Sequence, residues 1–300
     1  MRVFKLRPGD LDMMPIDRDR FERETGKRHP WYQPASDGET TSQFAVCPAC
    51  DNPIQIVGLY RLPAGVTEPF GKHTPRSIRD LADLDIERRD DCPFFKPRNL
   101  KRSRRRRPGD PLAANVLKLV IEQFDRIAWF LEKDTGIRFG RRTLKNMLES
   151  YRRLEGHRYA GATPINVPWT FAYMTTAVSL YGQRIVDNDE LARAICTALP
   201  DARIGEDGRI GRRDGANSFL DIRGSFICHE RAEDGSEAMT FQVYTVRDGA
   251  NQVLYSTRIR FRPRLFVRLV RSPDSSFRRP DLIDMAKTVL GYGPNDERRS

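Results

Sequence analysis

Three cysteines and one histidine in the first third of the chain have the types and spacing of zinc ligands. Cys47 and Cys50 form a Cys-Pro-Ala-Cys pair, and His73 and Cys92 complete a C-x2-C-x22-H-x18-C series. Zinc prefers four tetrahedral thiolate or imidazole ligands, and a two-residue spacer lets one tight turn present two sulfurs to the same ion. The series therefore predicts a Zn²⁺ site formed by Cys47, Cys50, His73 and Cys92.

The completeness of this ligand set favours a structural ion. A catalytic zinc keeps one coordination position open, whereas a Cys3His set closes all four. Zinc deaminases place a histidine and a glutamate before their P-C-x-x-C pair, but here His73 follows the pair and Pro75 stands at the glutamate position. Asp51-Asn-Pro53 predicts a turn where a thioredoxin-like motif would need a helix. Cysteines that are merely buried or redox active remain the alternative.

The residues around the cysteine pair predict the element that holds it. Phe44-Ala-Val46 and Ile54–Tyr60 indicate two short strands on either side of the metal turn, as in a zinc ribbon, and residues 77–89 indicate a helix. Residues 1–43 are polar and interrupted by prolines, so we expect an extended arm. The zinc-binding module is thus predicted over residues 44–95.

This module resembles uncharacterised bacterial zinc-ribbon-like proteins. The resemblance is carried by Cys47-Pro-Ala-Cys50, Ile56-Val-Gly-Leu-Tyr60, Gly71-Lys-His73, Leu81-Ala-Asp83 and Asp91-Cys-Pro93. It covers residues 44–95, implies a zinc-binding fold and a bacterial source, and implies no activity.

The remainder of the chain predicts an α+β fold. A basic linker is expected over 96–113, because a run of lysine and arginine ends at Pro108-Gly109. Apolar residues at three-four spacing predict a helical bundle over 114–204, with helices at 114–133, 141–154, 168–181 and 188–200.

Residues 205–217 indicate a mobile loop. Alternating apolar residues then predict a three-stranded antiparallel meander with an Asp248-Gly249 hairpin turn, covered by a terminal helix at 280–290, within a unit spanning 205–300.

The distribution of charge indicates a polyanionic partner. The chain has a net charge of +11, but residues 1–95 carry 14 Lys and Arg against 16 Asp and Glu, which leaves −2 there and +13 in the remainder. Side chains two apart on a strand share a face, so Arg258, Arg260, Arg262 and Arg264 are expected to form a row of guanidinium groups. Together with the linker, these arginines predict a nucleic-acid-binding surface that contacts phosphate. The predicted contacts are Lys101, Arg102, Arg104, Arg105, Arg106, Arg107, Arg258, Arg260, Arg262 and Arg264.

Other functions remain open. Residues 114–133 and 141–154 also permit a helix-turn-helix, with Arg141, Arg142 and Lys145 toward DNA. The protein-interaction alternative is a scaffold subunit docked through the zinc module, with a protein partner or a second copy of the chain. A nuclease is the enzymatic alternative, with Asp221 and Glu230 as candidate magnesium ligands. We find no nucleophile–base pair and no phosphate-binding loop, so the sequence indicates no particular reaction.

The first 30 residues lack the apolar region of a signal peptide, and no stretch approaches 18 apolar residues. We therefore expect no membrane partner. Five cysteines without such a signal favour a reducing compartment, which predicts a cytoplasmic protein. Cys196 and Cys228 are expected to be buried as small apolar residues.

Overall fold

The computed structural model describes most of the 300 residues. It describes all but residues 11–12, 36–39, 91, 96–99, 217–218, 233–235, 248, 273–277 and 292–300. The α+β class is confirmed, since helices and antiparallel sheets are mixed along the chain. Asp248 of the predicted hairpin turn, and Lys96 and Arg98 of the basic run, lie outside the described residues. No helix in the described ranges is long and apolar enough to cross a membrane.

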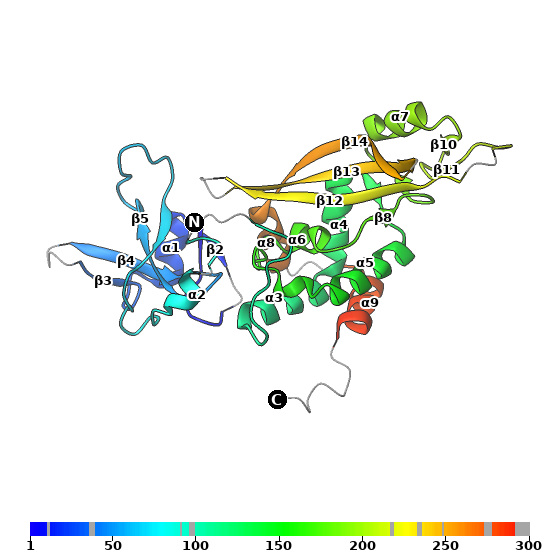
Figure 1. Cartoon of the computed structure of the whole chain (residues 1–300). Coiled ribbons are helices and arrows are strands. Elements are labelled where there is room, and N and C mark those ends of the chain that lie inside the picture. Colours follow the sequence, from blue (N-terminus) through cyan, green and yellow to red (C-terminus); the bar gives the residue numbers. More distant parts are fainter. Residues whose placement is uncertain are drawn as a thin grey trace.

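The amino-terminal part contains a four-stranded antiparallel sheet in the order β3-β4-β5-β6 (Figure 1). Its elements are β1 (Val3–Phe4), β2 (Met14–Pro15), α1 (Arg18–Thr25), β3 (Tyr32–Pro34), β4 (Thr41–Val46), β5 (Pro53–Val57), β6 (Phe70–His73) and α2 (Ile86–Asp90). The two strands expected beside the metal turn are β4 and β5. The predicted helix at 77–89 is reduced to α2, because Ile78 and Ala82 form a tight β-bridge that occupies the backbone before it.

The described residues among 1–43 are an integral part of this unit, which corrects the expectation of an extended arm. Phe4 and Phe21 are fully buried, with ring centroids 5.0 Å apart, in the same core as Cys47 and Ile54. Asp17 caps α1 by accepting a hydrogen bond from the Arg20 backbone N–H. The apolar positions are too few for a periodic pattern, so only the tertiary contacts reveal this packing.

The carboxy-terminal part combines helices with a sheet in the order β14-β13-β12-β8. Its helices are α3 (Pro111–Glu122), α4 (Phe124–Thr135), α5 (Arg141–Arg153), the 3-10 turn η1 (Gly156–Arg158), α6 (Val167–Tyr173), α7 (Asp189–Ala198), α8 (Pro263–Arg271) and α9 (Pro280–Leu290). Its strands are β7 (Ile137–Arg138), β8 (Val178–Ser179), β9 (Arg184–Ile185), β10 (Ala202–Ile204), β11 (Ile210–Arg212), β12 (Ile222–Arg231), β13 (Glu237–Arg247) and β14 (Ala250–Arg260).

One hydrophobic core extends from Val116 to Leu290 and joins the helices to the sheet. The bundle at 114–204 and the meander at 205–300, which the sequence suggested as separate units, therefore share their buried side chains. Figure 1 shows β12–β14 as a layer beside the helices, with α9 against α5. The terminal helix thus packs mainly on α3, α4 and α5, whereas the sequence suggested that it covers the meander.

Several predicted boundaries differ from the structure. The helix expected at 114–133 divides at Gln123, whose backbone leaves helical geometry with φ −120°. The helix expected at 168–181 ends at Tyr173, and β8 follows. The loop expected at 205–217 contains the second strand of the β10–β11 hairpin. Cys228 is exposed, because a β-bulge between Ile227 and Glu230 rotates it out of the alternating pattern, whereas Cys196 is partly buried.

Candidate metal centre

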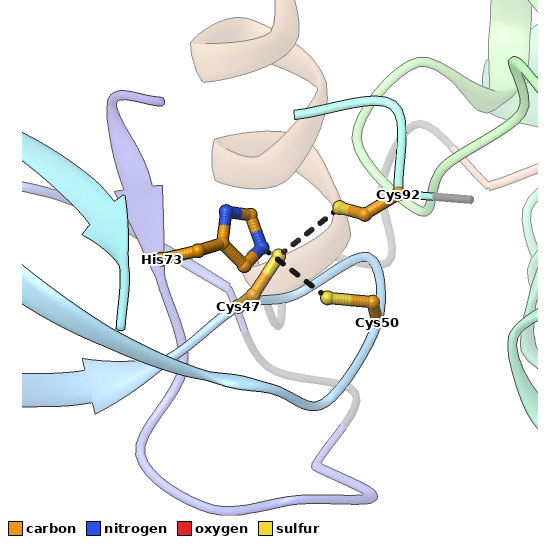
Figure 2. Close-up of side chains that lie close together, drawn as sticks. All are labelled: Cys47, Cys50, His73 and Cys92. Carbon is orange, nitrogen blue, oxygen red and sulfur yellow. Dashed lines mark hydrogen bonds between the residues drawn. The ribbon is translucent and has the colours of Figure 1, made fainter. Parts of the chain in front are cut away.

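Four side chains from three separate segments converge to form the candidate metal centre (Figure 2). Cys47 and Cys50 lie on the turn between β4 and β5, His73 ends β6, and Cys92 follows α2. Backbone pairing places His73 opposite Ile54, so the register of β5 and β6 delivers the imidazole to the cysteine turn. All four residues are buried.

The distances fit a tetrahedral zinc ion. The four ligand atoms lie within 4.8 Å of one another, with Cys47 Sγ 3.7 Å from Cys92 Sγ and Cys50 Sγ 3.3 Å from His73 Nε2. Ligands about 2.3 Å from a central zinc are separated by about 3.7 Å along the edges of a tetrahedron. The residues present therefore match the size and chemistry of a zinc site, and bound zinc would supply cross-linking of the three segments.

The backbone of the turn is arranged to support two thiolates. The Ala49 N–H donates to Cys47 Sγ and the Phe94 N–H donates to Cys92 Sγ, both at 3.4 Å. Donors of this kind stabilise negative charge on sulfur and orient it toward a metal. Both bonds are local, two residues along the chain from the sulfur that accepts.

Burial makes ionisation of all three thiols unfavourable in the absence of a cation. Burial raises the pKa of Cys47 and of Cys92, which disfavours their thiolates. Burial also opposes ionisation of Cys50, but hydrogen bonds from Cys47, Cys92 and His73 lower its pKa. The thiols thus compete for one negative charge, whereas a divalent ion would allow all three to ionise.

Residues outside the ligand set hold the turn in shape. Asp51 adopts a left-handed backbone conformation with φ +62°. Its carboxylate forms ion pairs with the buried Lys5 and, at 3.5 Å, with Arg88. Asn52, 1% exposed, donates to the Cys50 carbonyl oxygen at 3.2 Å and accepts from the Asp85 N–H at 2.8 Å. Sequence analysis missed Lys5 and Asn52, because their partners are distant in the chain.

The linker arginines are largely used within the protein. Arg105 donates two hydrogen bonds, at 3.1 and 2.9 Å, to the carbonyl oxygen of Leu154 at the end of α5. Arg106 donates to the carbonyl oxygens of Ala160 and Ala162, and Arg102 donates to that of Thr175. Free carbonyls at helix ends need such donors. This corrects the expectation that Arg105 and Arg106 face phosphate, whereas Arg102 stays exposed.

The other predicted linker contacts remain near the surface. Lys101 is exposed, and Arg107 is 77% exposed in an ion pair with Glu87 at 2.9 Å. Arg104 is half-buried, and its carbonyl oxygen accepts a hydrogen bond from Ala160.

The predicted row of four arginines on one strand is also corrected. β14 ends at Arg260, and Pro263 begins α8, so Arg262 and Arg264 leave the strand. Proline lacks the N–H that a sheet requires and suits the first turn of a helix. Arg258 pairs with Glu230 at 2.9 Å, Arg264 with Glu68 at 3.5 Å, and Arg262 with Asp134. Arg260 is exposed, and no ion pair links it to the residues that the structure describes.

The nuclease candidates do not come together. Asp221 pairs with Arg223 at 2.8 Å, and Glu230 pairs with Arg258. Within the described ranges, the Cys3His cluster is the one group of three or more His, Cys, Asp or Glu side chains with metal-binding geometry.

The comparisons with known proteins identify no relative of this chain. A scan against protein-family models, a search of curated proteins and a search of solved structures each find no match. The resemblance of residues 44–95 to bacterial zinc-ribbon-like proteins stays a prediction.

Proposed function

We propose that the protein binds nucleic acid and contains a structural zinc ion in a ribbon-like amino-terminal module. The single observation that carries the binding proposal is a set of exposed arginines at the end of β14 and on α8, the helix that follows it. Arg258 and Arg260 lie on one face of β14, and Arg264 and Arg268 lie one helical turn apart on α8. We call these four residues the junction arginines.

The junction arginines are available to phosphate. Phe266, 1% exposed, anchors α8 to the core, so Arg264 and Arg268 project on the exposed side of the helix. The ion pairs with Glu230 and Glu68 join side chains that are 45% exposed or more. Exposed pairs contribute at most about 1 kcal/mol, so phosphate can replace these carboxylates. The +13 charge of residues 96–300 would add long-range attraction.

The zinc ion is assigned a structural role in this proposal. Four protein ligands leave no position for a substrate, and all four side chains are buried. Three reduced thiols fit a reducing compartment, in line with a bacterial cytoplasmic protein.

A salt titration of the purified full chain tests the proposal. Labelled DNA and RNA are titrated at two salt concentrations, and the affinity is expected to fall steeply as salt rises, because phosphate binding releases condensed counterions. Binding that is absent even at low salt would overturn the proposal and favour the scaffold alternative. Incubation of the same nucleic acids with magnesium or manganese tests the nuclease alternative, and cleavage that persists after purification to homogeneity would replace the binding proposal with an enzymatic one.

A further inference from the structure

A cavity of about 560 Å³ lies among α4, α5, α8 and α9, far in sequence from the metal centre. Small-molecule sites in proteins have volumes of about 300–1,000 Å³ and are mostly apolar with a few convergent polar groups. An apolar lining is supplied by Phe139, between β7 and α5, and by Leu144 of α5, Leu269 of α8 and Leu282 of α9. We call this space the Arg126 cavity, after the buried arginine in its lining.

Arg126 lines the cavity and is 9% exposed. Its guanidinium donates from Nη1 to Gln123 Oε1 at 2.7 Å and from Nη2 to the Ser272 carbonyl oxygen at 3.3 Å. Both acceptors are neutral. No carboxylate forms an ion pair with Arg126 among the residues that the structure describes. A buried cation without a counter-ion is costly, which indicates that an anion belongs beside it.

The carboxylates near Arg126 are already occupied. Asp125 accepts hydrogen bonds from Arg278 Nε at 2.7 Å and from the Arg279 backbone N–H at 3.0 Å. Glu132 is held by Arg138 through two bonds of 2.9 and 3.0 Å. Arg138 and Arg279 also line the cavity, so with Arg126 its described lining holds three arginines against two carboxylates. Burial and then the charge of Arg278 lower the pKa of Arg126, a cost that a bound anion would relieve.

Trp129 gives the cavity a flat aromatic wall. Its side chain is 41% exposed on α4, and its ring meets that of Phe130 edge-on at 5.1 Å. Tryptophan combines a large apolar surface with one N–H donor, and it is typical of binding sites where one edge of a ligand is apolar. The cavity thus offers an aromatic wall, an apolar floor and one buried cation.

We propose that the Arg126 cavity binds a small organic monocarboxylate, with the carboxylate on Arg126 and an aromatic or aliphatic body against Trp129 and Leu282. A guanidinium matches a carboxylate by two parallel hydrogen bonds. One net positive charge in the described, mostly apolar lining suits a single negative charge better than a phosphate group. This site is independent of nucleic-acid binding.

Binding of phenylacetate to the full chain tests the proposal. Phenylacetamide is the neutral control of the same shape, and inorganic phosphate is the control anion that has no apolar group. Phenylacetate has about ten non-hydrogen atoms, so a Kd of about 1 mM is expected. We expect one site per chain by calorimetry, at least tenfold weaker binding of phenylacetamide and phosphate, and quenching of Trp129 fluorescence that disappears in Trp129→Phe.

The variant Arg126→Met separates binding from folding. This substitution removes a buried charge that has no ion-pair partner among the described residues and keeps a long, unbranched side chain. It should leave thermal stability unchanged or raised, yet abolish phenylacetate binding. Arg142→Met, at an exposed position of α5, makes the same charge change and should bind as the unaltered protein does. No binding of phenylacetate at about 10 mM, a tenfold excess over the expected Kd, would overturn the proposal. Equal binding of acid and amide, or full binding by a folded Arg126→Met, would do so too.

Discussion

Arg231, on β12, donates a hydrogen bond from its guanidinium to the backbone carbonyl oxygen of Pro93, the residue that follows Cys92 of the candidate metal centre. The same guanidinium lies over the Phe94 ring at 5.1 Å and forms an ion pair with the buried Glu237. The segment that closes the metal centre is thereby attached to the sheet of the carboxy-terminal part. Asn166 completes the arrangement by donating to Glu237 at 2.7 Å.

Purified protein should contain about one zinc ion per chain, and Cys47→Ser or Cys92→Ser should lose it together with much of the thermal stability of the amino-terminal part. Metal binding and folding of such a module are coupled, since structural zinc contributes about 10 kcal/mol or more. Metal analysis and thermal unfolding measure both effects. Cys228→Ser, at an exposed position outside the cluster, is the matched control. Metal-free protein of undiminished stability would contradict the assignment.

Replacing Arg258 and Arg260 by alanine should weaken DNA or RNA binding and reduce the slope of log affinity against log salt by about 2, because each lost phosphate contact removes about one released counterion. Both residues are exposed, so the melting temperature should change little. Arg142→Ala with Arg153→Ala removes the same charge from the exposed side of α5. If the salt slope fell in the Arg142/Arg153 variant and stayed unchanged in the Arg258/Arg260 variant, the helix-turn-helix interpretation would be correct instead.

Glu237→Gln should destabilise the protein by about 3 kcal/mol at neutral pH, because it leaves the buried Arg231 without its counter-charge. Burial alone would raise the pKa of Glu237, but Arg231, the nearby His229 and Asn166 lower it. A carboxylate with a lowered pKa contributes stability above its unfolded pKa of about 4.3, and that contribution is lost as pH falls toward the folded pKa.

Unfolding measured between neutral and acidic pH should therefore show a flatter acid limb for Glu237→Gln than for the unaltered protein. Glu149→Gln, at an exposed position of α5, controls for the general effect of removing a carboxylate. The same acid limb in both variants would show that Glu237 is not held in its charged form.

Gly136→Ala should cost about 3 kcal/mol of unfolding free energy, from a left-handed backbone and from overpacking. Gly136 ends α4 with φ +68°, and an added Cβ would lie 2.4 Å from the Asp187 carbonyl oxygen. Gly109 has φ +75° but no heavy atom within 4 Å of an added Cβ, so Gly109→Ala should cost only about 1 kcal/mol. If chemical denaturation showed the same loss of unfolding free energy for Gly136→Ala and Gly109→Ala, the loop that carries Asp187 would have to move aside freely.

The sequence predicted that Cys47, Cys50, His73 and Cys92 come together, although only the signal of the cysteine pair is local. Cys47 and Cys50 define a turn by spacing alone, whereas the approach of His73 depends on the register of β5 and β6, which no spacing specifies. The helix at 141–154 was also predictable, since its apolar stripe continues without interruption and α5 follows it closely.

The basic residues were harder to interpret, because charge does not reveal its partner. Arg105 binds the Leu154 carbonyl oxygen from 49 residues away, a contact visible only after folding. Pro263, in contrast, offered a local signal that β14 must end, and its position should have taken precedence over the alternation of arginines. Arg126 gave no signal at all, because an arginine in an amphipathic helix is ordinarily solvated.

The attachment of Pro93 to Arg231 has a consequence for biosynthesis. Protein folds from its amino terminus as it is made, so the cysteine turn, His73 and Cys92 leave the ribosome well before β12. Zinc captured at that stage would close the ligand cluster while the strand that later fastens its last segment has not yet been translated. Metal supply would then determine the state of the nascent amino-terminal part until β12 has been translated. With zinc it would be a folded unit, and without zinc it would be an open chain exposed to proteases.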